Sequence, residues 1–310
     1  MTSPPDPRDV RAELESLATE AFRPELADID RLATLDLARL MNGEDATVAG
    51  AVARRLPEIA AAIDAVAERM ARGGRLIYAG AGTAGRLGVL DASECPPTFN
   101  TDPAQVVGLI AGGPKALVTS VEGAEDSGDL ARTDLDALRL TPEDTVVGIS
   151  ASGRTPYALG AVAHARARGA LTVGLACNPG SALAAAADHG IEIVTGPELL
   201  TGSTRLKAGT AQKLVLNMLS TITMIRLGKT YGNLMVDVRA SNDKLRARSH
   251  RIVALATGAT DAEIERALAA TDGEVKHAIL VLLADVDAPT AARLLHESDG
   301  HLRAALAAAR

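Results

Sequence analysis

The chain has 310 residues, of which 47% are hydrophobic and 23% are charged, so it is globular rather than disordered. Its net charge of −7 has the wrong sign for a nucleic-acid backbone, and two Phe, three Tyr and no Trp offer few surfaces for stacking bases. We therefore expect no nucleic-acid partner. Without a long apolar stretch or a signal-peptide pattern, the sequence predicts a cytoplasmic protein with no membrane segment.

The cysteine and histidine residues of the chain are not spaced as in metal sites or disulfide frameworks. Cys95 and Cys177 are its only cysteines, and they form no C-x-x-C pair. Its six histidines show no metal-ligand spacing. We therefore expect no metal site and no disulfide framework, and we expect Cys95 to be buried and unreactive.

Residues 1–64 form an acidic, helical N-terminal region, with seven Arg and no Lys against thirteen Asp and Glu. The first ten residues are interpreted as a loose tail. From Val48 to Met70, apolar residues recur at spacings of three and four, which predicts one face of a helix with a bend at Pro57.

Five short apolar runs follow, separated by helical stretches such as 155–167 and 181–188. The runs are 75–80, 106–112, 145–151, 171–177 and 191–194. Runs that are apolar throughout are typical of strands covered on both faces. Their alternation with helices predicts an α/β fold with a doubly wound, parallel five-stranded sheet. Ligands of such sheets bind at the carboxyl ends of the strands.

The C-terminal part of the chain is predicted to be helical. Residues 206–227 form one long helix, apolar on nearly all sides, that would serve as a core helix or a subunit interface. Short helices follow from about residue 239, with breaks at Gly258, Asp272-Gly273 and Asp299-Gly300. We expect three parts: N-terminal helices over 1–64, an α/β domain over 65–228, and a small helical bundle or lid over 229–310.

A glycine-rich turn follows the first predicted strand. Gly80, Gly82 and Gly85 match G-x-G-x-x-G, the pattern of a dinucleotide-binding turn. That interpretation requires an acidic residue at the end of the next strand to hold a ribose, but the next strand runs into Gly112 instead. The turn, which includes Thr83, therefore indicates a phosphate at a helix N-terminus, or a tight turn alone.

A hydroxyl-rich loop follows the third predicted strand, in the stretch SASGRT. The hydroxyls of Ser150, Ser152 and Thr155, with backbone N–H groups, would surround a phosphate without a lysine. An ordinary helix N-cap is the alternative, because serine and threonine favour that position.

Two other stretches carry polar groups of interest. In TGSTRLK (201–207), Ser203 and Lys207 open the long helix, where cations are unfavourable unless an anion is present. Glu94 lies close in sequence to the glycine turn, directly before Pro96-Pro97, which should end its helix. Glu122 and Glu125 would share one face if their stretch were helical. A solvated surface position is the alternative for each carboxylate.

Together these stretches resemble the N-acetylmuramic acid 6-phosphate etherase family, which has the sugar isomerase (SIS) fold. The resemblance runs from about Ile29 to the C-terminus. It rests on GAGTAGRLGVLDASECPPTF, GLIAGG, VEGAED, ASGRTPY, GPELLTGSTRLKAGTAQKLVLNMLST and YGNLMVDV. The glucokinase regulatory protein shares several of these segments but has two SIS domains, and 310 residues allow only one.

The resemblance implies cleavage of the D-lactyl ether at C3 of N-acetylmuramic acid 6-phosphate during cell-wall sugar recycling. Elimination followed by hydration would give N-acetylglucosamine 6-phosphate and D-lactate, without any cofactor. Carried over to this chain, the family's proton donor is Glu94 and its second catalytic glutamate is Glu125. The loop that binds the phosphate would contain Ser150, Ser152 and Thr155. The residues that line the sugar would be Thr83, Ser203 and Lys207. The resemblance also implies a homodimer with sites at the interface.

One position departs from the family pattern. Relatives usually read GTSGR, whereas this chain has Ala84 in place of the serine, which removes a hydroxyl contact with the phosphate. Two other functions stay open: a non-catalytic sugar-phosphate sensor that regulates a kinase, and an aldose–ketose isomerase that also needs a base at C2. The acidic N-terminal region argues against a DNA-binding regulator.

Overall fold

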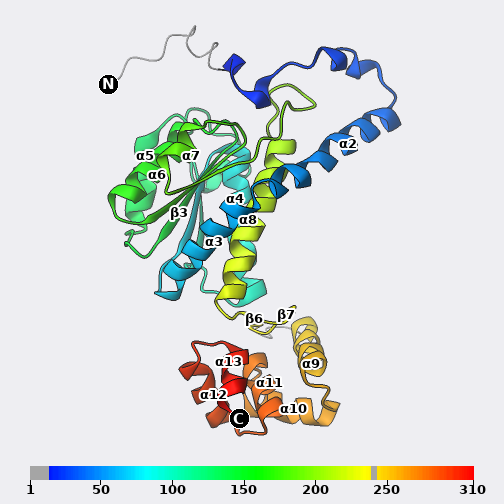
Figure 1. The fold of residues 1–310 in the computed structure, drawn as a ribbon, viewed down its shortest axis with the longest axis vertical. Coiled ribbons are helices and arrows are strands. Elements are labelled where there is room, and N and C mark those ends of the chain that lie inside the picture. The colour runs from blue at the N-terminus through cyan, green and yellow to red at the C-terminus, as the bar shows by residue number, and fades with distance from the viewer. Residues whose placement is uncertain (1–13, 239–242) are drawn as a thin grey trace. The chain divides into compact units, whose positions relative to one another are not determined.

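The computed structural model describes residues 14–238 and 243–310 (Figure 1). The chain divides into two compact units. Residues up to Ala92 together with 106–219 form the first unit, and 93–105 together with 220–310 form the second. The loose tail expected at the N-terminus lies outside the described residues.

The first unit is built on a parallel five-stranded sheet with the order β2-β1-β3-β4-β5. Its strands are β1 (Leu76–Gly80), β2 (Val106–Ile110), β3 (Thr145–Ser150), β4 (Leu171–Ala176) and β5 (His189–Glu192). This confirms the predicted fold class. The fifth strand begins two residues earlier than predicted, because Asp188 fixes its start. The Asp188 carboxylate accepts hydrogen bonds from the backbone N–H and the hydroxyl of Thr172, at 3.0 and 2.7 Å.

Helices cover both faces of the sheet (Figure 1). One face carries α5 (Gly128–Ala137), α6 (Pro156–Ala167) and α7 (Ala182–Ala186); the other carries α3 (Leu56–Ala71), α4 (Gly82–Phe99) and α8 (Lys207–Arg226). On the second face, the Tyr78 hydroxyl donates to Oδ2 of Asp91 at 2.7 Å. Asn217 donates to the other oxygen of Asp91 at 2.6 Å. One buried carboxylate therefore joins β1, α4 and α8.

The N-terminal region is helical, as predicted, but its long apolar face belongs to two helices. It contains the turns η1 (Ala18–Glu20), η2 (Pro24–Leu26) and η3 (Ile29–Arg31), followed by α2 (Thr34–Ala53) and α3. The apolar face is buried from Val48 to Met70 except at Leu56, which is exposed. Pro57 lies in the first turn of α3, where its missing N–H costs nothing, so the expected bend of one helix at this residue was wrong.

The prediction that Pro96 and Pro97 end their helix was also wrong, because α4 continues to Phe99. Each proline removes one helical N–H donor, but its carbonyl still accepts. The backbone N–H of Asn100 donates to the Pro96 carbonyl at 2.9 Å. The helix ends where Asn100 adopts a left-handed φ of 51°, a common way to terminate a helix.

The second unit contains a small helical bundle, as predicted. Its elements are β6 (Thr230–Tyr231), β7 (Leu234–Met235), α9 (Asp243–Thr257), α10 (Asp261–Ala270), α11 (Val275–Ala284), α12 (Ala288–Glu297) and α13 (Leu302–Ala308). The predicted breaks at Gly258, Asp272-Gly273 and Asp299-Gly300 all fall between helices. Its core is aliphatic, with Val253, Ile279 and Leu280 fully buried.

Candidate active site

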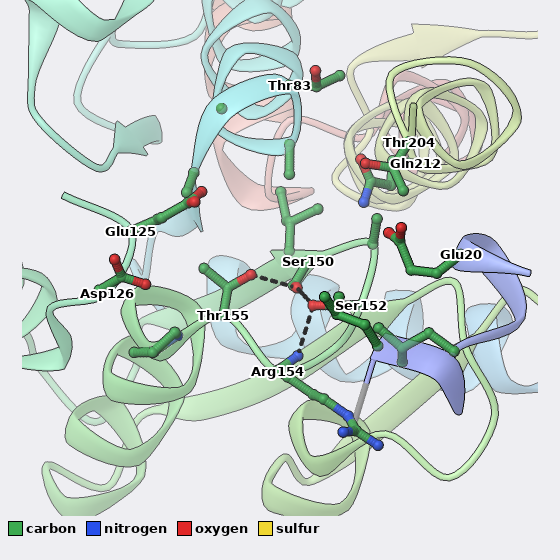
Figure 2. A pocket seen from close by; sticks show the side chains of 18 residues that line it. Glu20, Thr83, Glu125, Asp126, Ser150, Ser152, Arg154, Thr155, Thr204 and Gln212 are labelled. Atoms are coloured by element: carbon green, nitrogen blue, oxygen red, sulfur yellow. Dashed lines mark hydrogen bonds between the residues drawn. The ribbon is translucent and has the colours of Figure 1, made fainter. Parts of the chain in front are cut away.

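A cavity of about 650 Å³ opens at the carboxyl ends of β1 and β3 in the first unit (Figure 2). Its walls come from the segment around η1, the start of α4, the turn before α5, the β3–α6 loop and the start of α8. The lining residues are Leu14, Leu17, Glu20, Ala81, Gly82, Thr83, Ala84, Glu125, Asp126, Ile149, Ser150, Ala151, Ser152, Arg154, Thr155, Pro156, Thr204 and Gln212. The cavity lies at the edge of the sheet where doubly wound folds bind their ligands.

The glycine pattern at the end of β1 allows the helix that follows to approach the strand closely. A Cβ on Gly80 would lie 2.9 Å from the backbone nitrogen of Gly85, and a Cβ on Gly85 would lie 2.6 Å from the Gly80 carbonyl oxygen. Consequently α4 starts directly at the end of the strand, and Thr83 and Ala84 line the cavity from its first turn. N–H groups in a first helical turn have no intrahelical acceptor, so they favour an anion.

The hydroxyl-rich loop after β3 forms the floor of the cavity (Figure 2). The Ser150 hydroxyl lies 2.7 Å from that of Thr155 and 3.2 Å from that of Ser152. The backbone N–H of Gly153 donates to Ser150 at 3.0 Å, and that of Arg154 donates to Ser152 at 3.2 Å. These bonds order the loop and gather three hydroxyls at the cavity, and a hydroxyl proton can rotate to donate to an anion bound there.

Glu125 lines the cavity on the side of Thr155, next to Asp126 (Figure 2). Its backbone carbonyl accepts from the N–H of Tyr157 at 3.0 Å, which fixes the turn against the first residues of α6. The Tyr157 hydroxyl donates to Oδ2 of Asp134 at 2.6 Å, and burial, reinforced by this bond, raises the pKa of the phenol. The turn that carries Glu125 is therefore attached to a rigid part of the fold.

Glu122 and Glu125 do not share a helix face, because their stretch folds as turns. Glu122 instead lines an adjoining cavity of about 60 Å³, which has Glu125 and Arg86 on its walls. The side chain of Arg86 donates to the carbonyl of Leu117 at 3.0 Å. In a turn the two carboxylates can point in different directions, whereas residues three apart on a helix lie side by side and like charges repel.

Comparison with known proteins decides the family. Residues 58–166 match the model of the N-terminal SIS domain of the glucokinase regulatory protein, and residues 124–222 match the SIS domain model. The chain is 84% identical over 309 residues to an N-acetylmuramic acid 6-phosphate etherase of Streptomyces coelicolor, with 100% of this chain and 99% of that protein covered. The chain belongs to the N-acetylmuramic acid 6-phosphate etherase family. More distant etherases agree: that of Rubrobacter xylanophilus is 62% identical (94% of this chain, 97% of that protein), and that of Mycolicibacterium smegmatis is 55% identical (96% and 99%).

Of the two carboxylates expected from the resemblance, only Glu125 is among the described residues that line the cavity. Glu94 lies on α4, twelve residues after Gly82, which is about 18 Å along the helix axis at 1.5 Å per residue. Its side chain is exposed, and within the described chain it is not among the residues that line the cavity. Along α4, Glu94 is therefore more than three helical turns from Gly82.

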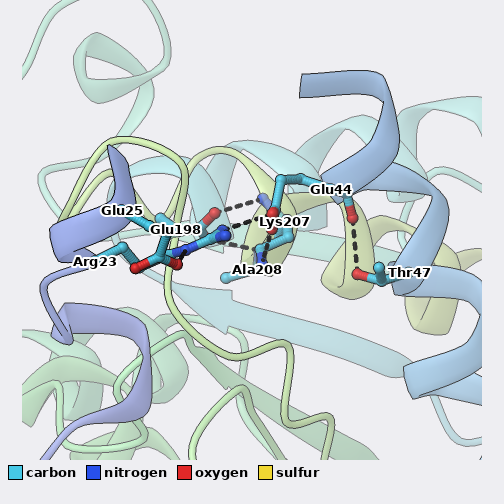
Figure 3. Close-up of polar contacts among 7 residues, drawn as sticks. All are labelled: Arg23, Glu25, Glu44, Thr47, Glu198, Lys207 and Ala208. Atoms are coloured by element: carbon cyan, nitrogen blue, oxygen red, sulfur yellow. Dashed lines mark hydrogen bonds and ion pairs between the residues drawn. The ribbon is translucent and has the colours of Figure 1, made fainter. Parts of the chain in front are cut away.

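Lys207, expected to line the sugar in an etherase, has a different position. Its side chain is buried, and its ammonium nitrogen lies 2.6 Å from Oε2 of Glu44 (Figure 3). Its backbone N–H and that of Ala208 each donate at 2.9 Å to the carboxylate of Glu198, which is 1% exposed. The anion predicted at this helix N-terminus is thus supplied by the protein itself. Ser203 lies in the preceding turn and is also outside the cavity lining within the described residues.

Glu20, Thr204 and Gln212 are among the lining residues that were not predicted as site residues. Glu20 reaches the cavity because Thr19, fully buried, is held by Asn178. The Asn178 side chain accepts from the Thr19 backbone N–H at 3.3 Å and donates to the Thr19 hydroxyl at 3.0 Å. No local pattern marks Glu20 in the sequence. Gln212 does carry a signal, since an amide in a helix that is apolar on nearly all sides requires a polar partner.

Other features bear on the expectations from composition. Over residues 14–238 and 243–310, no group of three or more His, Cys, Asp or Glu is arranged to hold a metal ion. None of the helices in this described part combines the length and apolarity needed to cross a membrane. Cys95 is buried, as predicted. Burial, together with the negative charge of Glu198, raises the pKa of the Cys177 thiol to about 12.

Proposed function

We propose that this protein is an N-acetylmuramic acid 6-phosphate etherase that cleaves the D-lactyl ether at C3 and releases D-lactate and N-acetylglucosamine 6-phosphate. The observation that carries the proposal is that one cavity, in a chain of this family, holds both the hydroxyl loop Ser150–Thr155 and the carboxylate of Glu125. The reaction would serve the recycling of cell-wall amino sugars.

The hydroxyl loop and the first turns of α4 and α6 bind the 6-phosphate. Ser150, Ser152 and Thr155 supply hydroxyl donors, and Thr83 adds another from the opposite wall. The helix N-termini contribute partial positive charge, which suits a doubly charged anion in a site without a lysine. Anchoring the phosphate places the sugar carbons toward Glu125 at the other side of the loop (Figure 2).

Glu125 is the base for the proton at C2. Opening the sugar ring exposes an aldehyde at C1, and this carbonyl acidifies the C2 proton. The Glu125 carboxylate takes that proton, the C3–O bond breaks, and the electron pair of the C2–H bond forms the C2–C3 double bond. The lactyl oxygen leaves with the C3–O electrons and receives a proton from an acid. Water then adds, with its hydroxyl on C3 and a proton on C2.

Glu94 is that acid, and we propose that it comes from a partner subunit in a homodimer. On its own α4, Glu94 is about 15 to 18 Å along the axis from Ala84 and Gly82, which line the cavity, and this is too far to act at C3 of a sugar bound there. In a two-fold dimer, each chain would give Glu94 to the site of the other. Co-expression of Glu94→Gln and Glu125→Gln tests this, because a mixed dimer regains one complete site.

Such a mixture should recover about a quarter of wild-type activity, because half of the dimers are mixed and each has one intact site. Either variant alone should release no lactate. If Glu94 and Glu125 acted within one chain, the co-expressed mixture would stay inactive. A monomer in light scattering would also contradict the shared site.

The function itself is tested by incubating the full chain with N-acetylmuramic acid 6-phosphate. The proposal predicts equal amounts of D-lactate and N-acetylglucosamine 6-phosphate. No release of lactate by the wild type would contradict it. A ketose phosphate as product would favour an isomerase, and binding without turnover would favour a sugar-phosphate sensor.

A further inference from the structure

Gln212 has a side-chain donor that the protein leaves without a partner. Its side chain is 1% exposed, and among the described residues its Nε2 has no hydrogen-bond partner. The residue lines the cavity from the third position after Gly209 on α8, and Figure 2 shows its amide directed into the cavity. Buried amide donors are almost always satisfied, so this one is expected to bond to whatever occupies the cavity.

Glu20 lines the same part of the cavity from the N-terminal segment. In Figure 2 it lies with Thr204 and Gln212 on the side opposite Glu125. Its carboxylate lies against the turn before α8, since a Cβ on Gly202 would come within 2.7 Å of Oε2. This turn is attached to the start of α8, the helix that carries Gln212, because the N–H of Gly209 donates to the Thr204 carbonyl at 2.9 Å. The described residues give the Glu20 carboxylate no hydrogen-bond donor or cation.

An acceptor and a donor thus face one region of the cavity beside an apolar surface. Leu14 and Leu17 line the cavity from the same segment as Glu20. A secondary amide with a methyl group matches this set, because it offers an N–H, a carbonyl oxygen and a small apolar end. Phosphate and carboxylate groups do not match it, because Glu20 would repel them.

We propose that Glu20 and Gln212 form the subsite for the acetamido group at C2 of the sugar. Glu20 accepts the amide N–H, Gln212 donates from Nε2 to the acetamido carbonyl oxygen, and Leu17 contacts the methyl group. The inference rests on the proposed function, since it assigns a place to one substituent of that substrate. These residues determine which 6-phosphosugar is bound and hold C2 in position, while the hydroxyl loop binds the phosphate.

Calorimetric binding of N-acetylglucosamine 6-phosphate and glucose 6-phosphate to the full-length protein tests the subsite. The wild type should prefer the acetamido sugar. The preference is the ratio of the two dissociation constants. In Gln212→Leu this ratio should fall about tenfold, as expected for one lost hydrogen bond. In Glu20→Gln it should fall at least as much, because the acceptor is charged. The affinity for glucose 6-phosphate should change less than about twofold. If the two residues had only a structural role, their substitution would lower the affinity for both sugar phosphates together.

Matched controls are available in the chain. Glu15→Gln changes an exposed carboxylate in the same segment, and Gln105→Leu changes a half-buried glutamine; neither residue lines the cavity within the described chain. Both should keep the wild-type preference. The proposal is overturned if Gln212→Leu and Glu20→Gln also keep it, if they weaken both sugars equally, or if the wild type has no preference. Failure of the wild type to bind either sugar phosphate would instead contradict the proposed function, and the subsite with it.

Discussion

The ammonium group of Lys207 lies 2.6 Å from Oε2 of Glu44, and this ion pair joins the start of α8 to α2 (Figure 3). Arg23 contacts the other oxygen of Glu44 at 2.5 Å. Burial works against the charge of Glu44, but hydrogen bonds from Lys207 and Arg23 outweigh it, and its pKa lies below the usual value. One carboxylate on α2 therefore holds both the N-terminal segment and the start of α8, and these two segments contribute residues to the cavity lining.

Glu44→Gln should destabilise the protein by about 3 kcal/mol, because it leaves the buried ammonium of Lys207 without a counter-charge. Lys207→Met should cost less, about 1 kcal/mol, because Glu44 keeps Arg23. Urea unfolding of both variants measures the difference. Arg39→Gln, which removes an exposed pair on the same helix, should change stability by less than about 0.5 kcal/mol. The reverse order of the first two variants would contradict this account.

Asp144 should make the stability of the sheet depend on pH. It is 1% exposed, and its carboxylate accepts from the Arg75 side chain at 2.9 and 2.7 Å and from the Thr141 N–H at 2.8 Å. Burial opposes its charge, but these bonds outweigh the burial and hold its pKa below the ordinary value. A carboxylate with a depressed pKa adds to the free energy of unfolding. This stabilisation is complete above the pKa of the unfolded state, about 3.9, and is lost as pH falls through the pKa of the folded state.

We therefore expect Asp144→Asn to lower the free energy of unfolding by about 3 kcal/mol at pH 7. The difference in this free energy between the variant and the wild type should narrow only below about pH 4. Chemical denaturation at several pH values measures this gap. Asp28→Asn, at an exposed ion pair, should have almost no effect. A gap that already closes between pH 7 and pH 5 would show that another group is responsible.

Gly153→Ala should impair phosphate binding through the shape of the hydroxyl loop. Gly153 has a φ of +71°, and a Cβ there would lie 2.4 Å from Cβ of Ser181. The loop must therefore shift, and we expect KM to rise by at least about tenfold, the usual effect of losing one charged hydrogen bond. Gly180→Ala is a matched control, because Gly180 also has a positive φ (+63°) but has open space around it. Equal KM values for the two variants would contradict the steric argument.

Ala84→Ser should add a hydroxyl where the resemblance predicts one. Ala84 lines the cavity in the first turn of α4, where a hydroxyl can donate to the phosphate. We expect KM to fall by about tenfold, as for the gain of one hydrogen bond to a charged group. Binding of N-acetylglucosamine, which has no phosphate, should not change. A variant with unchanged KM would place the phosphate away from this turn.

The sheet and the hydroxyl loop were predictable from sequence because each depends on adjacent residues. Strands buried on both faces appear as apolar runs, and Ser150 to Thr155 are consecutive, so the loop carries its own pattern. The start of β5 at His189 was not predictable, because pairing with β4 and not apolarity fixes it. Register of this kind is a property of the neighbouring strand.

Much of the remaining cavity depends on contacts between distant segments. Glu20 and Gln212 are far apart in sequence, and Thr19, Asn178 and the turn at Gly202 bring them to one wall. The dipole argument at Lys207 correctly required an anion. It could not reveal that Glu44 and Glu198 supply it, because local charge patterns do not identify partners from other helices.

Turnover of N-acetylmuramic acid 6-phosphate in D₂O and in ¹⁸O-labelled water tests the central claim most directly. The wild type should give D-lactate without the label and N-acetylglucosamine 6-phosphate with deuterium at C2 and ¹⁸O at C3. Glu94→Gln should release no lactate yet still exchange the C2 proton, and Glu125→Gln should do neither. The account would be contradicted by ¹⁸O in the lactate, by product without deuterium at C2, or by full lactate release from either variant.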